Sequence, residues 1–150
     1  MGDFYGIRKD FDILIDNSHA FNWCPDLIIA RDIYFYDKRT CSILTPFMYA
    51  YLEEIIRSTT TEYGRALVGN TCRKVGMSLI KFAKDQNIEN KKYVIELNRI
   101  QKYFQQSTAI DEENNRTSTV HGYMHPRFWT EEAFELLIHD IARMSKYAKF

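Results

Sequence analysis

The chain carries no net charge, because its 20 lysines and arginines are balanced by 20 aspartates and glutamates. A domain without an overall charge has no long-range attraction for nucleic acid or for an anionic membrane surface. The composition therefore excludes a protein that coats nucleic acid indiscriminately. Any contact with a polyanion has to be made by a local group of residues.

Cysteine is scarce, and long apolar runs are missing. The three cysteines, Cys24, Cys41 and Cys72, are widely separated, form no Cys-x-x-Cys pair and lack the spacing of a zinc ribbon. This pattern indicates small buried cysteines in a reducing compartment. The longest apolar runs, such as Leu27 to Ala30, are far too short to cross a bilayer, and no basic leader followed by an apolar segment opens the chain. We expect a soluble, cytoplasmic protein that does not enter a membrane.

Several catalytic and binding motifs are also missing. Gly64 and Gly69 lack the spacing of a P-loop or of a dinucleotide-binding turn, so no phosphate cradle is predicted. His121 and His125 have the spacing of two zinc ligands on one helical face, but no glutamate follows His121 to complete a His-Glu-x-x-His motif. The sequence therefore predicts no metal site and no cofactor.

No run of alternating polar and apolar residues indicates β-strands, and apolar residues instead recur at helical intervals. We predict helices from Ile7 to Ser18, Pro25 to Asp37, Ile43 to Ile56, Val75 to Ala83, Tyr93 to Phe104, and from Thr130 onward. The second of these segments is also compatible with a buried strand. With 150 residues and 45% apolar content, the chain can form one substantial core. The prediction is one all-α domain, residues 1–150, built as an antiparallel bundle of about five helices.

Local signals predict the ends and the faces of two of these helices. Thr130 can cap the last helix with its hydroxyl. The run Thr59 to Thr61 is expected to fray the end of the helix that contains Ile56. The adjacent Glu53 and Glu54 are expected to form a solvated flank of that same helix. Ten tyrosines, ten phenylalanines and two tryptophans require much buried surface, part of which can belong to a partner subunit.

The segment Asn-Arg-Thr-Ser-Thr-Val-His-Gly-Tyr, residues 115–123, holds the residues best suited to catalysis, because four residues separate Arg116 from His121. A guanidinium binds phosphate charge, and an imidazole takes the proton of an RNA 2′-hydroxyl, so this pair can cut RNA without a metal. On a straight helix the two side chains would point about 140° apart. The pair therefore requires a bent segment or residues pooled from two chains.

Arg116, His121, Gly122 and Tyr123, placed before the last helix of a small helical chain, resemble the motif of the HEPN superfamily. The resemblance implies metal-independent endoribonuclease activity in a homodimer whose arginines and histidines line one cleft. It implies that Arg116 holds the scissile phosphate and that His121 transfers protons. In the HepT-like toxin branch, a partner nucleotidyltransferase modifies the tyrosine that Tyr123 matches. The resemblance thus implies a toxin or phage-defence effector with RNA as its substrate and a cognate antitoxin as a partner.

The motif departs from many members of the superfamily directly after the arginine. Those members have Asn, Asp or His there, whereas this chain has Thr117, and Asn115 precedes the arginine instead. An amide that orients the arginine or the RNA is therefore expected to be displaced. His125 is expected to pack with Phe128 and Trp129 or to contact RNA by stacking.

Other interpretations of these residues stand beside the catalytic one. In one, Arg116 pairs with Glu112 or Glu113 on the surface, and His121 satisfies a backbone carbonyl at the start of a helix. In another, the chain is a non-catalytic helical module for interaction or nucleotide sensing. A weak basic group would flank Arg116 if the last two helices pack side by side, although such groups are usually solvated faces: Arg99, Lys102, Arg143, Lys146 and Lys149. If the chain is catalytic, replacing Arg116 or His121 with alanine is expected to abolish cleavage and to leave thermal unfolding unchanged.

Overall fold

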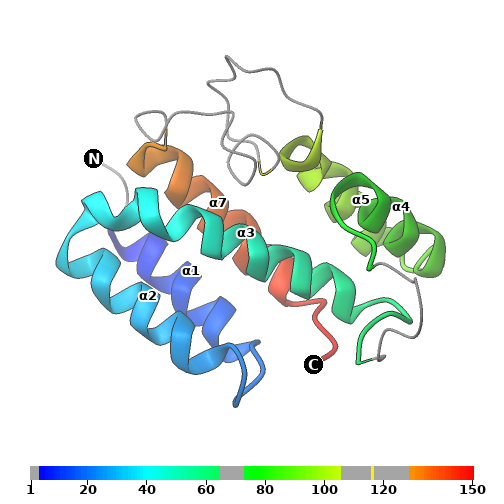
Figure 1. The fold of residues 1–150 in the computed structure, drawn as a ribbon, viewed down its shortest axis with the longest axis horizontal. Helices are drawn as coiled ribbons and strands as arrows, with labels where there is room; N and C mark the ends of the chain where they lie inside the picture. Colours follow the sequence, from blue (N-terminus) through cyan, green and yellow to red (C-terminus); the bar gives the residue numbers. More distant parts are fainter. Residues whose placement is uncertain (1–3, 65–72, 106–115, 117–128) are drawn as a thin grey trace.

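The computed structural model describes residues 4–64, 73–105, 116 and 129–150, and every regular element in these ranges is a helix (Figure 1). The α-helices are α1 (Phe4–Asp16), α2 (Cys24–Tyr36), α3 (Cys41–Ser58), α4 (Gly76–Gln86), α5 (Lys91–Ile100) and α7 (Glu131–Ser145). Two short 3-10 helices, η1 (Lys38–Thr40) and η2 (Gln101–Phe104), precede α3 and follow α5. The predicted all-α bundle is confirmed, and the segment that begins near Pro25 is a helix rather than a strand.

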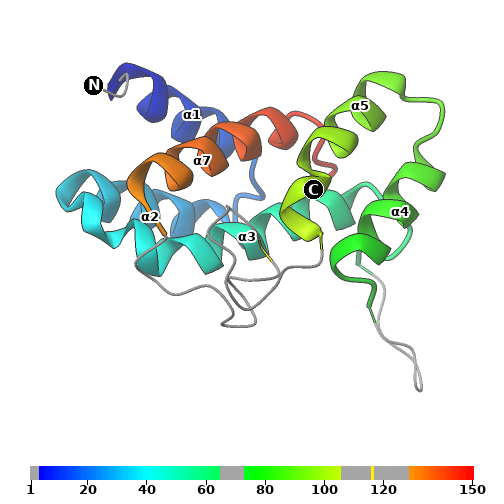
Figure 2. The same cartoon turned by 90° about the horizontal axis from the view of Figure 1, so that it is seen from above.

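Helix α3 forms the centre of the bundle. Its residues Tyr51, Leu52, Ile55 and Ile56 are fully buried and form one broad stripe, and Glu53 and Arg57, which lie outside this stripe, are buried as well. Helix α7 packs along α1 and α3, α2 packs on α1, and α4 packs on α3 (Figures 1 and 2). Helices α1, α2 and α3 alternate in direction, whereas α7 runs in the same direction as α3 (Figure 1). Because neighbours cover α3 on several sides, a polar residue in its middle is shielded from water.

Aromatic side chains fill the core between α1, α2 and α7. Phe11, Tyr34 and Phe134 are buried, and the ring centroids of Tyr34 and Phe134 lie 4.9 Å apart in a tilted arrangement. The Tyr34 hydroxyl donates a hydrogen bond to Oε1 of Glu135 at 2.7 Å, which satisfies its polar end. The inner stripe of α7 faces this core, and all of its members are buried: Phe134, Leu137, Ile138, Ile141 and Ser145.

The predicted start of the last helix is also confirmed. The Thr130 side chain accepts a hydrogen bond from the backbone N–H of Ala133 at 3.2 Å. Glu131 and Glu132 occupy the first turn of α7, where negative charge is favourable.

The end of α3 is more ordered than the threonine run predicts. Thr59 and Thr60 are buried, and their hydroxyls donate to the carbonyls of Ile56 at 2.7 Å and Arg57 at 2.8 Å. The backbone N–H groups of Thr59 and Thr60 donate to the same two carbonyls, so the last carbonyls of the helix are satisfied. The chain therefore leaves α3 through a hydrogen-bonded turn, and the expected fraying does not occur.

Candidate functional site

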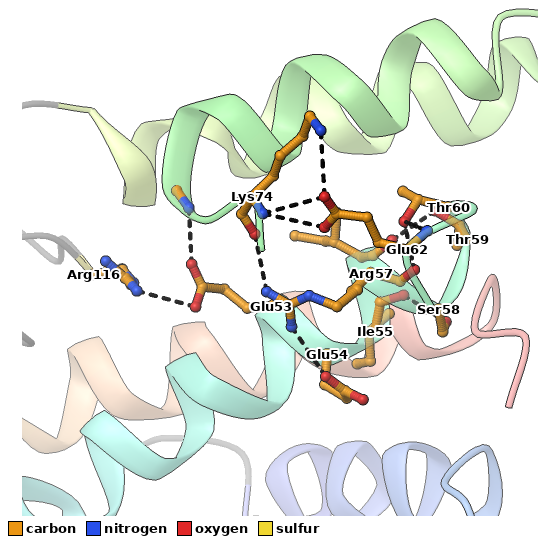
Figure 3. A network of polar contacts seen from close by, with 12 residues as sticks. Glu53, Glu54, Ile55, Arg57, Ser58, Thr59, Thr60, Glu62, Lys74 and Arg116 are labelled. Carbon is orange, nitrogen blue, oxygen red and sulfur yellow. Dashed lines mark hydrogen bonds and ion pairs between the residues drawn. The ribbon is translucent and has the colours of Figure 1, made fainter. Parts of the chain in front are cut away.

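Arg116 is the predicted catalytic residue that falls within the described part of the chain. Its guanidinium Nη2 lies 3.0 Å from Oε2 of Glu53, which is 63 residues earlier in the sequence (Figure 3). Only 12% of the Arg116 side chain and 10% of the Glu53 side chain are exposed. Opposite charges shielded from water attract each other more strongly than charges on an open surface. Glu53 therefore holds Arg116 against the body of the bundle.

Glu53 connects three parts of the chain through its two carboxylate oxygens. It belongs to α3, its Oε2 accepts from Arg116, and its Oε1 accepts the backbone N–H of Gly76 at 2.9 Å. Gly76 is the first residue of α4 and has a φ of 55°, a conformation that strains a residue with a side chain. The Glu53 carboxylate thus lies at the positive end of the α4 dipole, where a negative charge is stabilised.

The burial of Glu53 contradicts the solvated flank predicted for Glu53 and Glu54. Adjacent glutamates on an isolated helix face water, whereas in the structure α4 and Arg116 contact Glu53. Glu54 points elsewhere, as expected for adjacent helical residues, and its carboxylate lies 3.0 Å from Nη1 of Arg57. The signal in the sequence is that apolar residues precede and follow the two glutamates along α3.

Arg57 fixes the residues that lead into α4. It is buried, and its Nη2 donates to the backbone carbonyl of Lys74 at 3.1 Å (Figure 3). The Lys74 ammonium in turn lies 3.3 Å from a carboxylate oxygen of Glu62. These contacts tie the chain just before Gly76 to α3, so the N–H that binds Glu53 has a defined position.

The geometry around Arg116 leaves hydrogen-bonding capacity unused. A guanidinium has five N–H donors in one plane, a pattern that matches a carboxylate or a phosphate. Glu53 engages Nη2, whereas Nε is buried and has no hydrogen-bond partner among the described residues. The buried Nε is shielded from solvent, so an oxyanion would have to bind donors other than Nε, and proton transfer requires a second group.

The remaining predicted site residues lie outside the described residues: Asn115, His121, Tyr123 and His125. Their predicted roles stay predictions. Glu112 and Glu113, the local acids considered as partners of Arg116, also lie outside the described residues. The partner that the structure does show, Glu53, is remote in sequence, so no spacing rule along the chain would have found it.

Carboxylates neutralise much of the basic group predicted on the last two helices. Helices α5 and α7 pack side by side, and Arg143 of α7 lies 2.5 Å from Glu96 of α5. Arg99 lies 3.0 Å from the same carboxylate. The hydrogen bond from Arg143 lowers the pKa of Glu96, against the opposing effect of burial, and Arg99 lowers it further. Arg99 and Arg143 therefore join α5 to α7 instead of forming an unpaired basic patch.

Asp140 of α7 is a fully buried charge that the sequence reasoning missed. Its carboxylate accepts hydrogen bonds from the Arg99 guanidinium and, at 2.5 Å, from the Tyr103 hydroxyl. Burial, together with the bond to Asp140, raises the pKa of Tyr103 above its ordinary value. The available signal is the position of Asp140 at the edge of the apolar stripe of α7, three residues after Leu137.

Other features of the described residues bear on the predictions about metals, membranes and cysteines. Within the described ranges, no three His, Cys, Asp or Glu side chains gather in a way that could hold a metal ion. No described helix has the length and apolar character to span a bilayer. Cys24 and Cys41 are both free thiols, and Cys41 is buried. Cys72 lies outside the described residues.

Comparisons of this chain with protein-family models, with curated proteins and with solved structures found no match.

Proposed function

We propose that this chain is a metal-independent endoribonuclease of the HEPN type. The observation that carries the proposal is the anchored, nearly buried Arg116 at the start of the Arg116, His121, Tyr123 motif. Burying a guanidinium is costly unless it is paired, and Glu53 provides that pair through Nη2, one nitrogen of a group with five N–H donors. The all-helical bundle agrees with the fold that the resemblance implies.

In the proposed reaction, the 2′-oxygen of a ribose attacks the neighbouring phosphorus. His121 takes the proton of the 2′-hydroxyl, and the bond between phosphorus and the 5′-oxygen breaks. The 5′-oxygen receives a proton from the imidazolium of a second copy of His121. Arg116 binds the phosphate oxygens as their negative charge increases. The products are a 2′,3′-cyclic phosphate and a 5′-hydroxyl, and the active species is a homodimer.

The partners and the biological role of the proposed nuclease follow from the same resemblance. RNA is the substrate, and Asn115 and His125 contact it. The protein acts in the cytoplasm as a toxin or a phage-defence effector, held in check by a cognate antitoxin. Tyr123 is the residue that a partner nucleotidyltransferase modifies.

Cleavage of labelled single-stranded RNA and of pooled tRNA, with a chelator present, tests the proposal. The wild type is expected to cut both, whereas His121→Ala is expected to cut neither while unfolding at the wild-type temperature. A DNA oligonucleotide of matched sequence is expected to stay intact, because it lacks the attacking hydroxyl. Equal cleavage of RNA by His121→Ala and the wild type would show that the proposal is wrong.

The role of Arg116 is better tested by a lysine substitution than by the alanine substitution that the sequence alone suggests. Removal of Arg116 leaves the buried Glu53 carboxylate without its cation, so alanine is now expected to lower stability as well as activity. Arg116→Lys keeps the positive charge but lacks the planar fork that binds phosphate. We expect this variant to fold and to lose most of its cleavage activity.

A second function, a non-catalytic interaction or nucleotide-sensing module, is favoured by a surface on α4 and α5. A cavity of about 450 Å³ there is lined by Ile88, Val94 and Ile95, with Lys84 and Lys91 beside them. Ile88 is 69% exposed and Ile95 is 63% exposed. Exposed apolar side chains next to charged ones are typical of docking surfaces. A folded wild type that stays monomeric in sedimentation and cuts neither RNA would favour this function over catalysis.

A further inference from the structure

Glu53 is one of the most firmly held charged side chains in the described part of the molecule. It projects from the middle of α3, it is buried, and each of its carboxylate oxygens has a hydrogen-bond donor. The Gly76 N–H binds one oxygen and Arg116 binds the other (Figure 3). The Glu53 carboxylate therefore cannot rotate without breaking its hydrogen bond from the Gly76 N–H, which links α3 to the start of α4.

We propose that Glu53 is the positioning residue for Arg116 in the cleavage reaction, an inference that rests on the proposed function. An arginine side chain has several rotatable bonds, and a free guanidinium samples many orientations. Glu53 holds Nη2 at 3.0 Å, so the guanidinium samples fewer orientations, and the donors that Glu53 does not engage are the ones proposed to bind the phosphate. The scissile phosphate then meets donors that are already oriented, which lowers the barrier of the chemical step.

The contact with Gly76 explains why the Glu53 carboxylate can orient Arg116 without moving together with it. If Glu53 had Arg116 as its sole partner, both side chains could move together. The 2.9 Å bond from the Gly76 N–H and the positive end of the α4 dipole hold the carboxylate from the other side. The Glu53 side chain therefore fixes the position of Arg116 relative to two helices, α3 and α4.

Glu53→Gln is the sharpest test, because glutamine keeps the size of the side chain and an acceptor for the Gly76 N–H but removes the charge that holds Arg116. Glu54→Gln is the matched control. Glu54 is the next residue of α3 and also pairs with an arginine, Arg57 at 3.0 Å, but it does not contact Arg116. Glu53→Asp keeps the charge and draws the carboxylate back by one methylene, which provides a second variant if the glutamine variant does not fold.

The measurement is single-turnover cleavage of the labelled single-stranded RNA with a chelator present. The rate is expressed per folded molecule, with the folded fraction taken from circular dichroism. Glu53→Gln is expected to lower the rate constant at saturating RNA by about tenfold to a hundredfold. The half-saturating RNA concentration is expected to change by less than about threefold, because orientation matters most in the transition state. Glu53→Asp is expected to lose less, and Glu54→Gln is expected to match the wild type.

A purely structural role for Glu53 predicts other results. Structural damage would lower the folded fraction and leave the rate constant of the folded molecules unchanged. In an Arg116→Lys background, Glu53→Gln is expected to cause less than about a twofold further loss, because Glu53 acts through the guanidinium that is already absent. An additive loss in that background would overturn the inference.

The remaining outcomes separate the inference from the proposed function. Wild-type rates per folded molecule in Glu53→Gln, or in Glu53→Asp if the glutamine variant does not fold, would overturn the positioning role while RNA cleavage itself stands. Equal losses of rate in the Glu53→Gln and Glu54→Gln variants would overturn the positioning role too. Faster cleavage by Glu53→Gln would also overturn it, because it would mean that the carboxylate competes with the phosphate for Arg116. A folded wild type that cuts no RNA would remove the proposed function and the inference together.

Discussion

The guanidinium of Arg116 and the carboxylate of Glu53 lie 3.0 Å apart, although Glu53 comes 63 positions earlier in the sequence. The same carboxylate binds the first backbone N–H of α4 at 2.9 Å. One side chain therefore joins the central helix, the start of α4 and the arginine of the proposed active site. Substitutions at this point are expected to change stability and activity together, and the experiments have to separate the two effects.

The first prediction concerns the stability of this pair. Arg116→Ala is expected to lower the free energy of unfolding by about 3 kcal/mol, because it leaves a buried carboxylate without its partner. The measurement is urea unfolding followed by circular dichroism. The double variant Glu53→Gln and Arg116→Ala is expected to lose less than the sum of the two single losses, since the charge that would be left unpaired is also removed. Additive losses would show that the pair contributes no coupling energy.

The second prediction concerns Asp140, whose side chain is fully buried between Arg99 and Tyr103. Asp140→Ala is expected to lower the free energy of unfolding by about 3–5 kcal/mol, because it leaves the buried Tyr103 hydroxyl without its acceptor and removes one of the two carboxylates that pair with Arg99. The adjacent His139 provides the control: it is 51% exposed and lies 3.0 Å from Asp10. His139→Ala is expected to cost less than about 1 kcal/mol. Similar denaturation midpoints for the two variants would contradict a structural role for the Asp140 network.

The helices could be predicted from the sequence because their signals are local. The apolar positions of α3 and α7 repeat at helical spacing, and Thr130 stands where a capping residue is expected. These features depend on residues within four positions of each other. Burial of a helical face, in contrast, depends on which neighbours cover it, and the local pattern does not name those neighbours.

The candidate site shows this difference most clearly. Arg116 was identified from its spacing to His121, but its partner, Glu53, was expected to be solvated. Two adjacent glutamates on an isolated helix do form a polar flank. In the structure, the chain before α4 is held against α3 through Arg57, and this contact places Gly76 over Glu53. A pairing across such a distance depends on the tertiary fold, and neither periodicity nor motif spacing contains it.

The third prediction concerns the start of α7. Thr130→Ala is expected to lower the free energy of unfolding by about 1 kcal/mol, because the backbone N–H of Ala133 loses the acceptor at 3.2 Å. Thr130→Ser keeps an oxygen at the same position and is expected to unfold within about 0.5 kcal/mol of the wild type. Denaturant midpoints of the three proteins provide the comparison. A loss of equal size in the serine variant would assign the effect to the methyl group of Thr130 rather than to the cap.

The last prediction is a pH dependence that originates at Glu96. Hydrogen bonds from Arg143 and Arg99 lower the pKa of this carboxyl in the folded protein below its ordinary value of 4.5. Above pH 4.5 the group is charged in both the folded and the unfolded chain, so its pairing contributes fully to stability. As the pH falls below 4.5, the unfolded chain takes up a proton first. The contribution then declines, and it is lost once the pH has passed through the lower folded pKa.

Glu96→Gln isolates this contribution because glutamine cannot titrate. The difference in the free energy of unfolding between the wild type and this variant is expected to be largest near neutral pH and to shrink as the solution is made more acidic than pH 4.5. Glu89, which is exposed and has no ion pair among the described residues, provides the control. Glu89→Gln is expected to follow the wild type at every pH. A difference between the wild type and Glu96→Gln that stays constant across this range would mean that the two arginines do not stabilise the charged form of Glu96, and that packing alone holds α5 against α7.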